Sequence, residues 1–298
     1  MKGFNLKWLV ILVVIGVAVG AYLISSKSPV DQAVTAYFAE MPADVYKISE
    51  KDFVAKVKAE ESMFILDIRQ PDVYAKGHIK GAVNAPWGTA ISDNLELLPQ
   101  DETIMVYCYT GQTAGQAVAL LNMAGFDAKS VNLGWDLGIS KVEGVAEIIE
   151  TEANYFTTEP VKVDKKIKAA ITDYFEGLDT VKGTTYANYK ISEADAKALL
   201  DEEDPDVVFL SVRKAEDFLN GHIESATNIP FGKGMEANFN TLPKDKKIIV
   251  YCYTGQTAGQ VVAGLRMLGY DAVSMNGGAG MPSNAPAGWV NKGYPLVK

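Results

Sequence analysis

Cysteine and histidine are the scarcest residues of this chain, with two of each among 298 residues. Cys108 and Cys252 stand at the same place in two copies of one repeated stretch, so a disulfide would join equivalent points of two domains. No CxxC motif is present, and the spacing of His78 and His222 from the cysteines is not that of a zinc site. We therefore expect no metal, no cofactor, and two unpaired thiols that serve as reactive groups.

Positive charge is also in deficit. The chain carries 28 Lys and Arg residues against 37 Asp and Glu, a formal net charge of −9 at pH 7. Phosphate groups repel such a chain, and no basic stripe occurs, so nucleic acid is not expected as a partner. A disordered chain is not expected either, because hydrophobic residues make up 48% of the sequence and charged residues only 22%. The length predicts about two ordinary domains.

A long hydrophobic run occurs once, at residues 8–24, after Lys2 and Lys7. The run is long for the core of a signal peptide and just long enough to span a bilayer, and the lysines favour an N-terminus left in the cytoplasm. Residues 18–20 also offer a small-residue cleavage site. We therefore expect residues 1–28 to form an N-terminal hydrophobic helix that is a membrane anchor or a signal peptide. The remainder is then exported: membrane-anchored and facing the periplasm or cell exterior, or periplasmic or secreted after cleavage.

The stretch VYCYTGQTAGQ occurs twice, at residues 106–116 and 250–260. The similarity extends to both sides of it. DIR at 67–69 corresponds to SVR at 211–213, GHI at 77–79 to GHI at 221–223, and YKISE at 46–50 to YKISE at 189–193. An ancestral duplication explains this pattern. We expect a first domain at residues 30–145 and a second at 160–298, with a linker and the first helix of the second copy at about 143–165.

Each copy alternates short apolar strands with helices. Copy one has predicted strands at 63–68, 103–108 and 127–132, a helix that opens at Ser49, a short helix that stops at Gly77, and a helix at 113–123. Copy two has equivalent strands at 207–212 and 247–252. Such alternation is typical of an α/β fold with a mostly parallel sheet and helices on both faces.

Each cysteine comes at the carboxyl end of a predicted buried strand, before a glycine-containing turn and a helix. Ligand sites of open parallel sheets lie beyond these strand ends. A loop that curls into a helix N-terminus directs several backbone N–H groups inward, and this concavity stabilises a thiolate or another anion on the sulfur. The candidate nucleophiles are Cys108 and Cys252. The predicted substrate-binding loops consist of Tyr109, Thr110, Gly111, Gln112 and Thr113 in copy one, and of Tyr253, Thr254, Gly255, Gln256 and Thr257 in copy two.

The sequence resembles the rhodanese (sulfurtransferase) family in a motif of D-x-R, then G-H-I-x-G-A-x-N-x-P, then a strand that ends in C-x-x-G-x-T. The matching residues are Asp67, Arg69, Gly77, His78, Ile79, Gly81, Ala82, Asn84, Pro86 and Cys108 in copy one, and Arg213, Gly221, His222, Ile223, Ala226, Asn228, Pro230 and Cys252 in copy two. The resemblance covers about residues 30–298. It implies two tandem rhodanese-like domains and a cysteine that accepts sulfane sulfur as a persulfide and passes it to cyanide, a thiol or a protein.

The sequence departs from the family pattern in three respects. The loop CYTGQT is neutral, whereas many family members that use thiosulfate carry Arg or Lys beside the cysteine, so polysulfide and thiol-bound donors stay open. Two-domain members often keep only the C-terminal cysteine, and this chain keeps both. Ser211 replaces Asp67 in copy two, which leaves Arg213 without a nearby carboxylate. For Arg69 we prefer a bracing, supporting role with Asp67 over the attraction of an anionic donor.

A reactive cysteine in an anion-binding loop is compatible with three functions. The first is a sulfurtransferase that moves sulfane sulfur from thiosulfate, polysulfide or a persulfide donor to a thiol or cyanide. The second is a persulfide carrier without turnover that delivers sulfur to a membrane partner. A cysteine phosphatase is disfavoured, because Ala114 and Ala258 stand where it needs an arginine. The expected partners are small sulfur-containing anions or thiols, a protein sulfur acceptor, and the membrane through the N-terminal segment.

Overall fold

The computed structural model of the protein describes residues 27–298. The hydrophobic run at residues 8–24 lies outside this range, and its role as an anchor or a signal peptide stays a prediction. Among the described residues, no helix combines the length and the apolar character needed to cross a membrane.

The first domain contains a five-stranded sheet in which all neighbouring strands run parallel. The strand order is β1 (Lys47–Ile48), β6 (Ala128–Val131), β5 (Ile104–Tyr107), β2 (Phe64–Asp67) and β4 (Val83–Asn84). The central strands β5 and β2 are apolar and almost completely buried, as expected for a sheet covered on both faces. Both were predicted as buried strands, and Cys108 follows directly after β5.

The second domain repeats this architecture. Its parallel sheet has the order β10 (Thr227–Asn228), β9 (Val207–Ser211), β11 (Lys247–Tyr251), β12 (Ala272–Met275) and β8 (Lys190–Ile191). Taken from the other edge, this order places each strand where its counterpart lies in the first domain. The predicted tandem arrangement of two α/β domains with parallel sheets is therefore confirmed.

One helix covers the outer face of each sheet. α3 (Glu50–Lys58) packs in the first domain and α9 (Glu193–Asp201) in the second, each against its own apolar cluster. The side chains of Ser49 and Ser192 accept a hydrogen bond from the third backbone N–H of these helices, at 3.0 Å in both cases. A serine cap satisfies an N–H group that has no partner within the helix, so the predicted start at Ser49 is confirmed.

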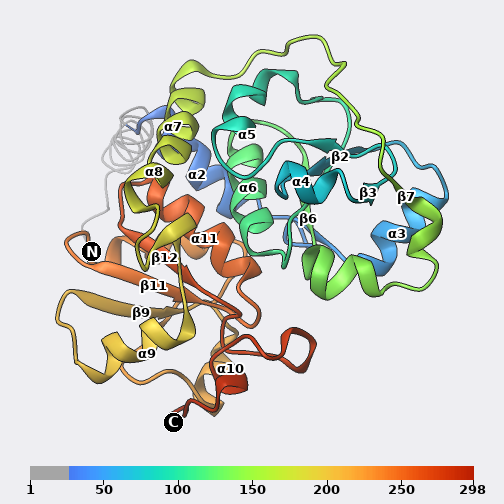
Figure 1. Cartoon of the computed structure of the whole chain (residues 1–298). Coiled ribbons are helices and arrows are strands. Elements are labelled where there is room, and N and C mark those ends of the chain that lie inside the picture. The colour runs from blue at the N-terminus through green and yellow to red at the C-terminus, as the bar shows by residue number, and fades with distance from the viewer. Residues whose placement is uncertain (1–26) are drawn as a thin grey trace, which may run out of the picture.

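The inner faces of both sheets share one continuous apolar cluster. α6 (Gln112–Met123) and α11 (Gln256–Met267) pack directly against each other there, as Figure 1 shows between the two sheets. A Cβ atom at Gly115 would lie 2.3 Å from the carbonyl oxygen of Gln256, and one at Gly259 would lie 2.4 Å from that of Gln112. Only glycine permits this approach of the two helices.

Two further helices connect the domains. α2 (Pro29–Ala39) and α7 (Lys165–Glu176) both contact α11, and α2 also contacts α6. The hydroxyl of Tyr37 in α2 donates to Oε1 of Gln260 at 2.6 Å, and the hydroxyl of Tyr174 in α7 donates to Oε1 of Gln116. Each of these two helices therefore bonds to the inner helix of the opposite domain.

The segment between the two sheets differs in part from the predicted linker with its helix at 143–165. β7 (Ile149–Glu150) pairs antiparallel with β3 (His78–Ile79), and the helix begins only at Lys165, where the side chain of Asp164 caps it. The other α-helices of the described residues are short: α4 (Pro71–Tyr74), α5 (Thr89–Asp93), α8 (Leu178–Val181) and α10 (Ala215–Asn220). The helix predicted to stop at Gly77 is α4, a single turn that ends before it.

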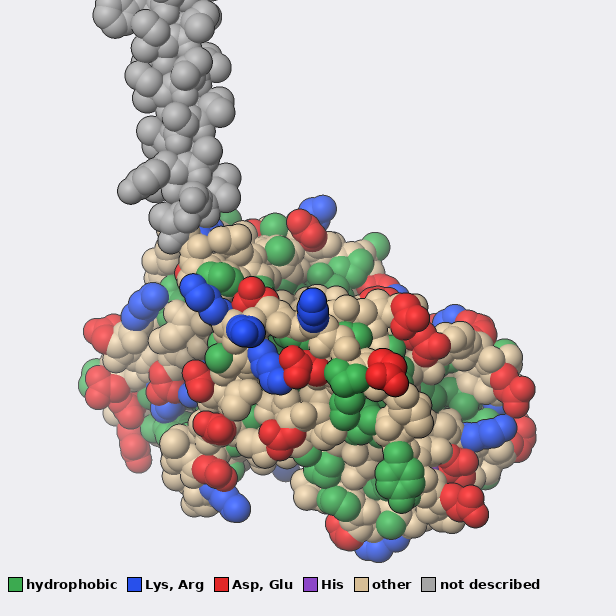
Figure 2. Space-filling view, turned by 90° about the horizontal axis from the view of Figure 1, so that it is seen from above, with side chains coloured by type: hydrophobic (Ala, Val, Ile, Leu, Met, Phe, Trp, Pro, Cys, Tyr) green, Lys and Arg blue, Asp and Glu red, His purple; other side chains and the backbone are tan. Residues whose placement is uncertain are grey.

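Charged side chains are interspersed on the molecular surface. On the face shown in Figure 2, Lys and Arg side chains lie among Asp and Glu side chains. Pairs such as Lys56 with Glu61 and Lys80 with Glu60 are well exposed to solvent. Exposed pairs of this kind contribute only about 0–1 kcal/mol each, so the shared apolar core contributes most to stability.

Candidate active sites at the domain interface

Cys108 lies in a cradle of backbone amides. The chain turns after β5 at Gly111, whose φ of +88° is in the left-handed region, and the thiol is 2% exposed. Sγ accepts hydrogen bonds from the N–H of Gly111 at 3.1 Å and of Ala114 at 3.4 Å. Both N–H groups belong to the start of α6, where the helix dipole is positive. This geometry stabilises negative charge on the sulfur.

Cys252 lies in an equivalent loop of the second domain, where one backbone N–H of the described residues, rather than two, donates to the sulfur. Gly255 has a φ of +93° and its N–H donates to Sγ at 3.1 Å. The thiol is again 2% exposed, and neither cysteine forms a disulfide. The sequence therefore predicted both the position of the sulfur and the direction of the loop amides.

The other loop residues have separate roles. The hydroxyl of Tyr109 accepts from the N–H of Gln70 at 3.1 Å, and that of Tyr253 accepts from the N–H of Lys214 at 3.1 Å, so both tyrosines fix the cysteine loop to its neighbour. In the described part of the chain, the hydroxyls of the four loop threonines do not bond to either sulfur. These are Thr110, Thr113, Thr254 and Thr257.

Gln112 and Gln256 reach across to the opposite domain. Nε2 of Gln112 donates to the hydroxyl of Ser274 at 2.7 Å, and Nε2 of Gln256 donates to the hydroxyl of Ser130 at 2.7 Å. Both serines lie in the strand next to the edge of their sheet. The two cysteine loops are thus held against each other's domains by one reciprocal pair of contacts.

The cavity beside Cys252 is built from both domains. It has a volume of about 460 Å³, and the second domain contributes Cys252, Thr254 and Phe231 to its lining. The first domain contributes Lys47 and Leu133. A molecule that reaches Cys252 through this cavity therefore also contacts residues of the first domain.

A second cavity, of about 330 Å³, lies beside the first cysteine loop. Thr110 and Gln112 line it from the first domain, and Lys190 and Glu193 line it from the second. Sequence reasoning missed Lys47 and Lys190 as cavity residues. The available signal was the repeated YKISE stretch, which contains both lysines.

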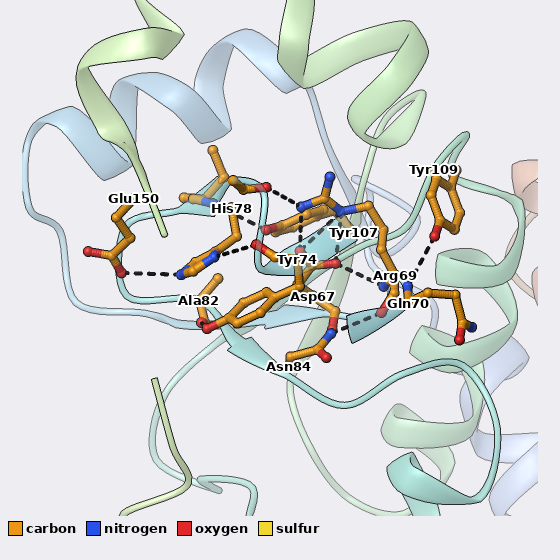
Figure 3. Close-up of polar contacts among 12 residues, drawn as sticks. Asp67, Arg69, Gln70, Tyr74, His78, Ala82, Asn84, Tyr107, Tyr109 and Glu150 are labelled. Atoms are coloured by element: carbon orange, nitrogen blue, oxygen red, sulfur yellow. Dashed lines mark hydrogen bonds and ion pairs between the residues drawn. The ribbon is translucent and has the colours of Figure 1, made fainter. Parts of the chain in front are cut away.

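Asp67 and Arg69 form a buried ion pair (Figure 3), and both side chains are at most 1% exposed. Nη2 of Arg69 donates to Asp67 at 2.6 Å and to the carbonyl oxygen of Gly77 at 2.9 Å. Burial lowers the pKa of Arg69, but the Asp67 carboxylate outweighs this and leaves the pKa raised. The guanidinium stacks on the rings of Tyr107 and Trp135, in the outer cluster rather than beside the cysteine. This geometry favours the bracing interpretation.

Arg213 has fewer partners than Arg69. It donates through Nη2 to the carbonyl oxygen of Gly221, and its Nε has no partner among the described residues. Ser211 accepts only the backbone N–H of Arg213, at 3.4 Å. The loss of a carboxylate that the sequence predicted therefore leaves a buried guanidinium without a counter-ion in the described chain.

The two histidines brace turns. Nδ1 of His78 lies 2.9 Å from the carbonyl oxygen of Tyr74, and Nδ1 of His222 lies 3.0 Å from that of Phe218. Each imidazole also stacks on the ring of the same residue. Within residues 27–298, no group of three or more His, Cys, Asp or Glu side chains is arranged to hold a metal ion.

Two regions of the chain match the sequence pattern of one known family. Residues 49–139 and 192–279 each match the rhodanese-like domain, and together they cover more than half of the chain. Each region contains one of the two cysteines.

Three known proteins illustrate the similarity. A Bacillus subtilis (strain 168) protein, named as a candidate sulfur carrier, is 34% identical over 88 residues, which are 30% of this chain and 47% of that protein. A thiosulfate sulfurtransferase of Pseudomonas fluorescens is 33% identical over 84 residues, which are 28% of this chain and 76% of that protein. A thiosulfate sulfurtransferase of Escherichia coli (strain K12) is 32% identical over 88 residues, which are 26% of this chain and 78% of that protein. The chain thus spans about half the length of the first relative and about three quarters of the other two.

Proposed function

Since this chain belongs to the rhodanese-like domain family, we propose that it is a sulfurtransferase in which Cys108 and Cys252 each carry sulfane sulfur as a persulfide. The observation that carries this proposal is the pair of amide cradles. In both domains, the N–H of a left-handed glycine donates to a free, buried thiol at 3.1 Å. Cys252 lines a cavity, and the loop of Cys108 lines another through Thr110 and Gln112. Such a cradle stabilises the cysteine thiolate before sulfur transfer and the persulfide anion after it.

The first half-reaction loads the cysteine. The thiolate attacks the outer sulfur of thiosulfate, a bond forms between Sγ and that sulfur, and sulfite leaves with the electron pair of the broken S–S bond. With a polysulfide donor, the leaving group is the shortened polysulfide. The negative charge of the persulfide then lies on its terminal sulfur, next to the loop whose Gly111 or Gly255 amide bonds to Sγ in the free thiol.

The second half-reaction unloads it. A cyanide ion or an acceptor thiolate attacks the terminal sulfur, and Sγ leaves as a thiolate with the electron pair of the S–S bond. The cysteine thus returns to its starting state, and sulfane sulfur passes from donor to acceptor without net oxidation of the protein. No proton has to be removed by a separate base, because the thiolate is itself the nucleophile.

Both thiosulfate and polysulfide suit this chemistry as donors. The names of the Pseudomonas and Escherichia relatives favour thiosulfate, and the neutral loop CYTGQT leaves polysulfide and thiol-bound persulfides as candidates. A carrier without turnover is the second candidate function. The name of the Bacillus relative favours it, and so does the burial of both thiols.

We further propose that the protein works outside the cytoplasm, anchored by its N-terminal segment or released after its cleavage. The lysine-flanked run at residues 8–24 supports this location. Cell fractionation tests it: the full-length protein should appear with the membrane and a deletion of residues 1–27 should release it. Recovery of the full-length chain from the cytoplasm would contradict the proposal.

Steady-state turnover tests the sulfurtransferase proposal. Thiosulfate or polysulfide is supplied with cyanide or a small thiol, and the rate is measured for wild type, Cys108→Ser, Cys252→Ser and the double variant. Each single variant should keep the activity of one site, and the double variant should lose activity while its circular dichroism stays unchanged. Turnover by the double variant would refute the mechanism. Loading of both cysteines without turnover would favour the carrier.

A further inference from the structure

Each of the two cavities is lined by two lysines, of which one is exposed and one is half-buried. The exposed ones are Lys214 and Lys292, and the half-buried one comes in each case from the domain opposite the cysteine loop. Lys47 lies in β1 of the first domain and lines the cavity of Cys252 together with Thr254. Lys190 lies in β8 of the second domain and lines the cavity beside the first cysteine loop together with Thr110. The cation that the loop CYTGQT lacks is therefore present in each cavity from another part of the chain.

The reciprocal glutamine contacts hold the lysines in place. Lys47 pairs in register with Ser130 of β6, and Ser130 accepts the side-chain hydrogen bond of Gln256 at 2.7 Å. Gln256 begins the helix that follows the Cys252 loop. One strand pairing and one hydrogen bond thus connect Lys47 to the cysteine loop of the second domain.

The second domain repeats this connection in the opposite direction. Lys190 pairs in register with Ser274 of β12, and Ser274 accepts the side-chain hydrogen bond of Gln112 at 2.7 Å. Gln112 begins the helix that follows the Cys108 loop. Each domain therefore supplies one lysine that is connected to the cysteine loop of the other domain.

Both ammonium groups are free to bind an anion. Each lysine is half-buried, and within the described residues neither side chain forms an ion pair or a hydrogen bond. Glu50 lines the cavity of Lys47, and Glu193 lines that of Lys190 and accepts the backbone N–H of Gly288, but in the part of the chain that the structure describes neither carboxylate forms an ion pair with the lysine of its cavity. Burial lowers the pKa of Lys47, and the negative charge of Cys252 offsets part of this decrease. Burial likewise lowers the pKa of Lys190, and the negative charge of Cys108 offsets part of the decrease. Each lysine is thus in the electrostatic field of the opposite domain's sulfur.

We propose that Lys47 binds the anionic sulfur donor for Cys252 and that Lys190 binds it for Cys108, so that each site is completed by the other domain. This inference rests on the proposed sulfurtransferase function and deepens it. The donor class is a sulfane-sulfur anion, such as thiosulfate or polysulfide, whose charged end lies at the ammonium group while its outer sulfur faces Sγ. A half-buried ammonium without a partner suits such an anion, because few water molecules compete for it.

Single-site proteins test the crossing. Lys47→Gln in the Cys108→Ser background and Lys190→Gln in the Cys252→Ser background should each lower kcat/KM for thiosulfate by about 10- to 100-fold, the loss expected for one hydrogen bond to a charged group. Lys47→Arg and Lys190→Arg should restore most of the rate. Lys51→Gln, an exposed change of equal charge, serves as the control. The proposal would be overturned if each Lys→Gln change lowered kcat/KM more for the cysteine of its own domain than for that of the opposite domain. It would also be overturned if neither change lowered kcat/KM.

Alkylation separates this inference from the proposed function. The rates of Cys252 with iodoacetate, an anion, and with iodoacetamide, which is neutral, are compared in the Cys108→Ser protein. Lys47→Gln should lower the ratio of the iodoacetate rate to the iodoacetamide rate several-fold, because only the anion is attracted by the ammonium group. This result is expected whether or not the protein transfers sulfur. An unchanged ratio would overturn the role of Lys47, whereas a changed ratio without any thiosulfate or polysulfide turnover would refute only the sulfurtransferase proposal.

Discussion

Arg69 and Arg213 occupy equivalent positions in the two domains but have different partners. Arg69 has the carboxylate of Asp67 and the ring of Trp135, whereas Arg213 faces Ser211 and keeps an Nε atom that finds no acceptor in the described chain. Burying a charge without a counter-ion lowers stability, so the second domain contains a defect that the first domain lacks.

Substitutions at these positions should have opposite effects. We expect Asp67→Asn to lower the free energy of unfolding by about 3–5 kcal/mol, because buried Arg69 loses its counter-ion. Ser211→Asp should raise it by about 1–3 kcal/mol, since the new carboxylate supplies an acceptor for Nε of Arg213. Urea denaturation measures both values. A loss of stability from both substitutions, or none from Asp67→Asn, would show that the arginines do not depend on these partners.

At the scale of single residues, the sequence predicts what the local chain determines. Cys108 follows a strand and precedes a turning glycine, and Asp67 is two residues from Arg69, so both the amide cradle and the ion pair could be anticipated. The positions of Lys47 and Lys190 could not. The repeated YKISE stretch contains both lysines, but their role depends on which cysteine loop their strand approaches. Packing between segments far apart in the chain determines this approach.

At the scale of secondary-structure elements, the contact between α6 and α11 positions both sites. Each helix begins at the turn that cradles a sulfur, and their glycines bring the two helices close together. The sequence predicted a helix at 113–123, close to the observed α6. It did not predict which face of that helix is covered, because α6 is buried on nearly every side and its apolar pattern does not distinguish the sheet from the partner helix.

Gly115→Ala tests this contact. Its Cβ would lie 2.3 Å from a backbone carbonyl oxygen of α11, so the helices must separate, and we expect a loss of about 1–3 kcal/mol in the free energy of unfolding. Gly232→Ala is the matched control, because a Cβ there meets no atom within 4 Å. Thermal denaturation of both variants measures the difference, and equal melting temperatures would contradict the account.

At the scale of the whole molecule, the two domains share one apolar core rather than a boundary. The sequence indicated two domains through its repeat and gave no sign that their cores are continuous. Helices α2 and α7 add to this continuity, because each bonds to an inner helix of the opposite domain through a buried tyrosine, Tyr37 or Tyr174. The domains should therefore unfold together.

The buried tyrosines predict a loss of stability at alkaline pH. Burial raises the pKa of Tyr37, Tyr107 and Tyr174 well above its usual value. A raised pKa in the folded state contributes stability in full below the unfolded value of about 10, and this contribution falls as pH rises beyond it, by about 1.4 kcal/mol per pH unit and tyrosine.

Urea denaturation between about pH 8 and 11 tests this expectation. The free energy of unfolding should fall above about pH 10, where the tyrosines of the unfolded chain ionise. At each pH, urea should unfold both domains in one transition. Tyr37→Phe should make the fall less steep, whereas Tyr155→Phe, which changes a side chain that is 76% exposed, should not. Two separate transitions, or a slope unaffected by Tyr37→Phe, would contradict the shared core or the tyrosine effect.

The central claim is that each domain carries sulfur on its own cysteine, and the mass of the intact protein after exposure to thiosulfate or polysulfide tests it most directly. Excess donor is removed before the mass is measured, and peptide mapping then locates the added sulfur. We expect two added sulfur atoms in the wild type, one in Cys108→Ser, one in Cys252→Ser and none in the double variant. Sulfur retained by the double variant, or a wild type that takes up none from either donor, would contradict the account.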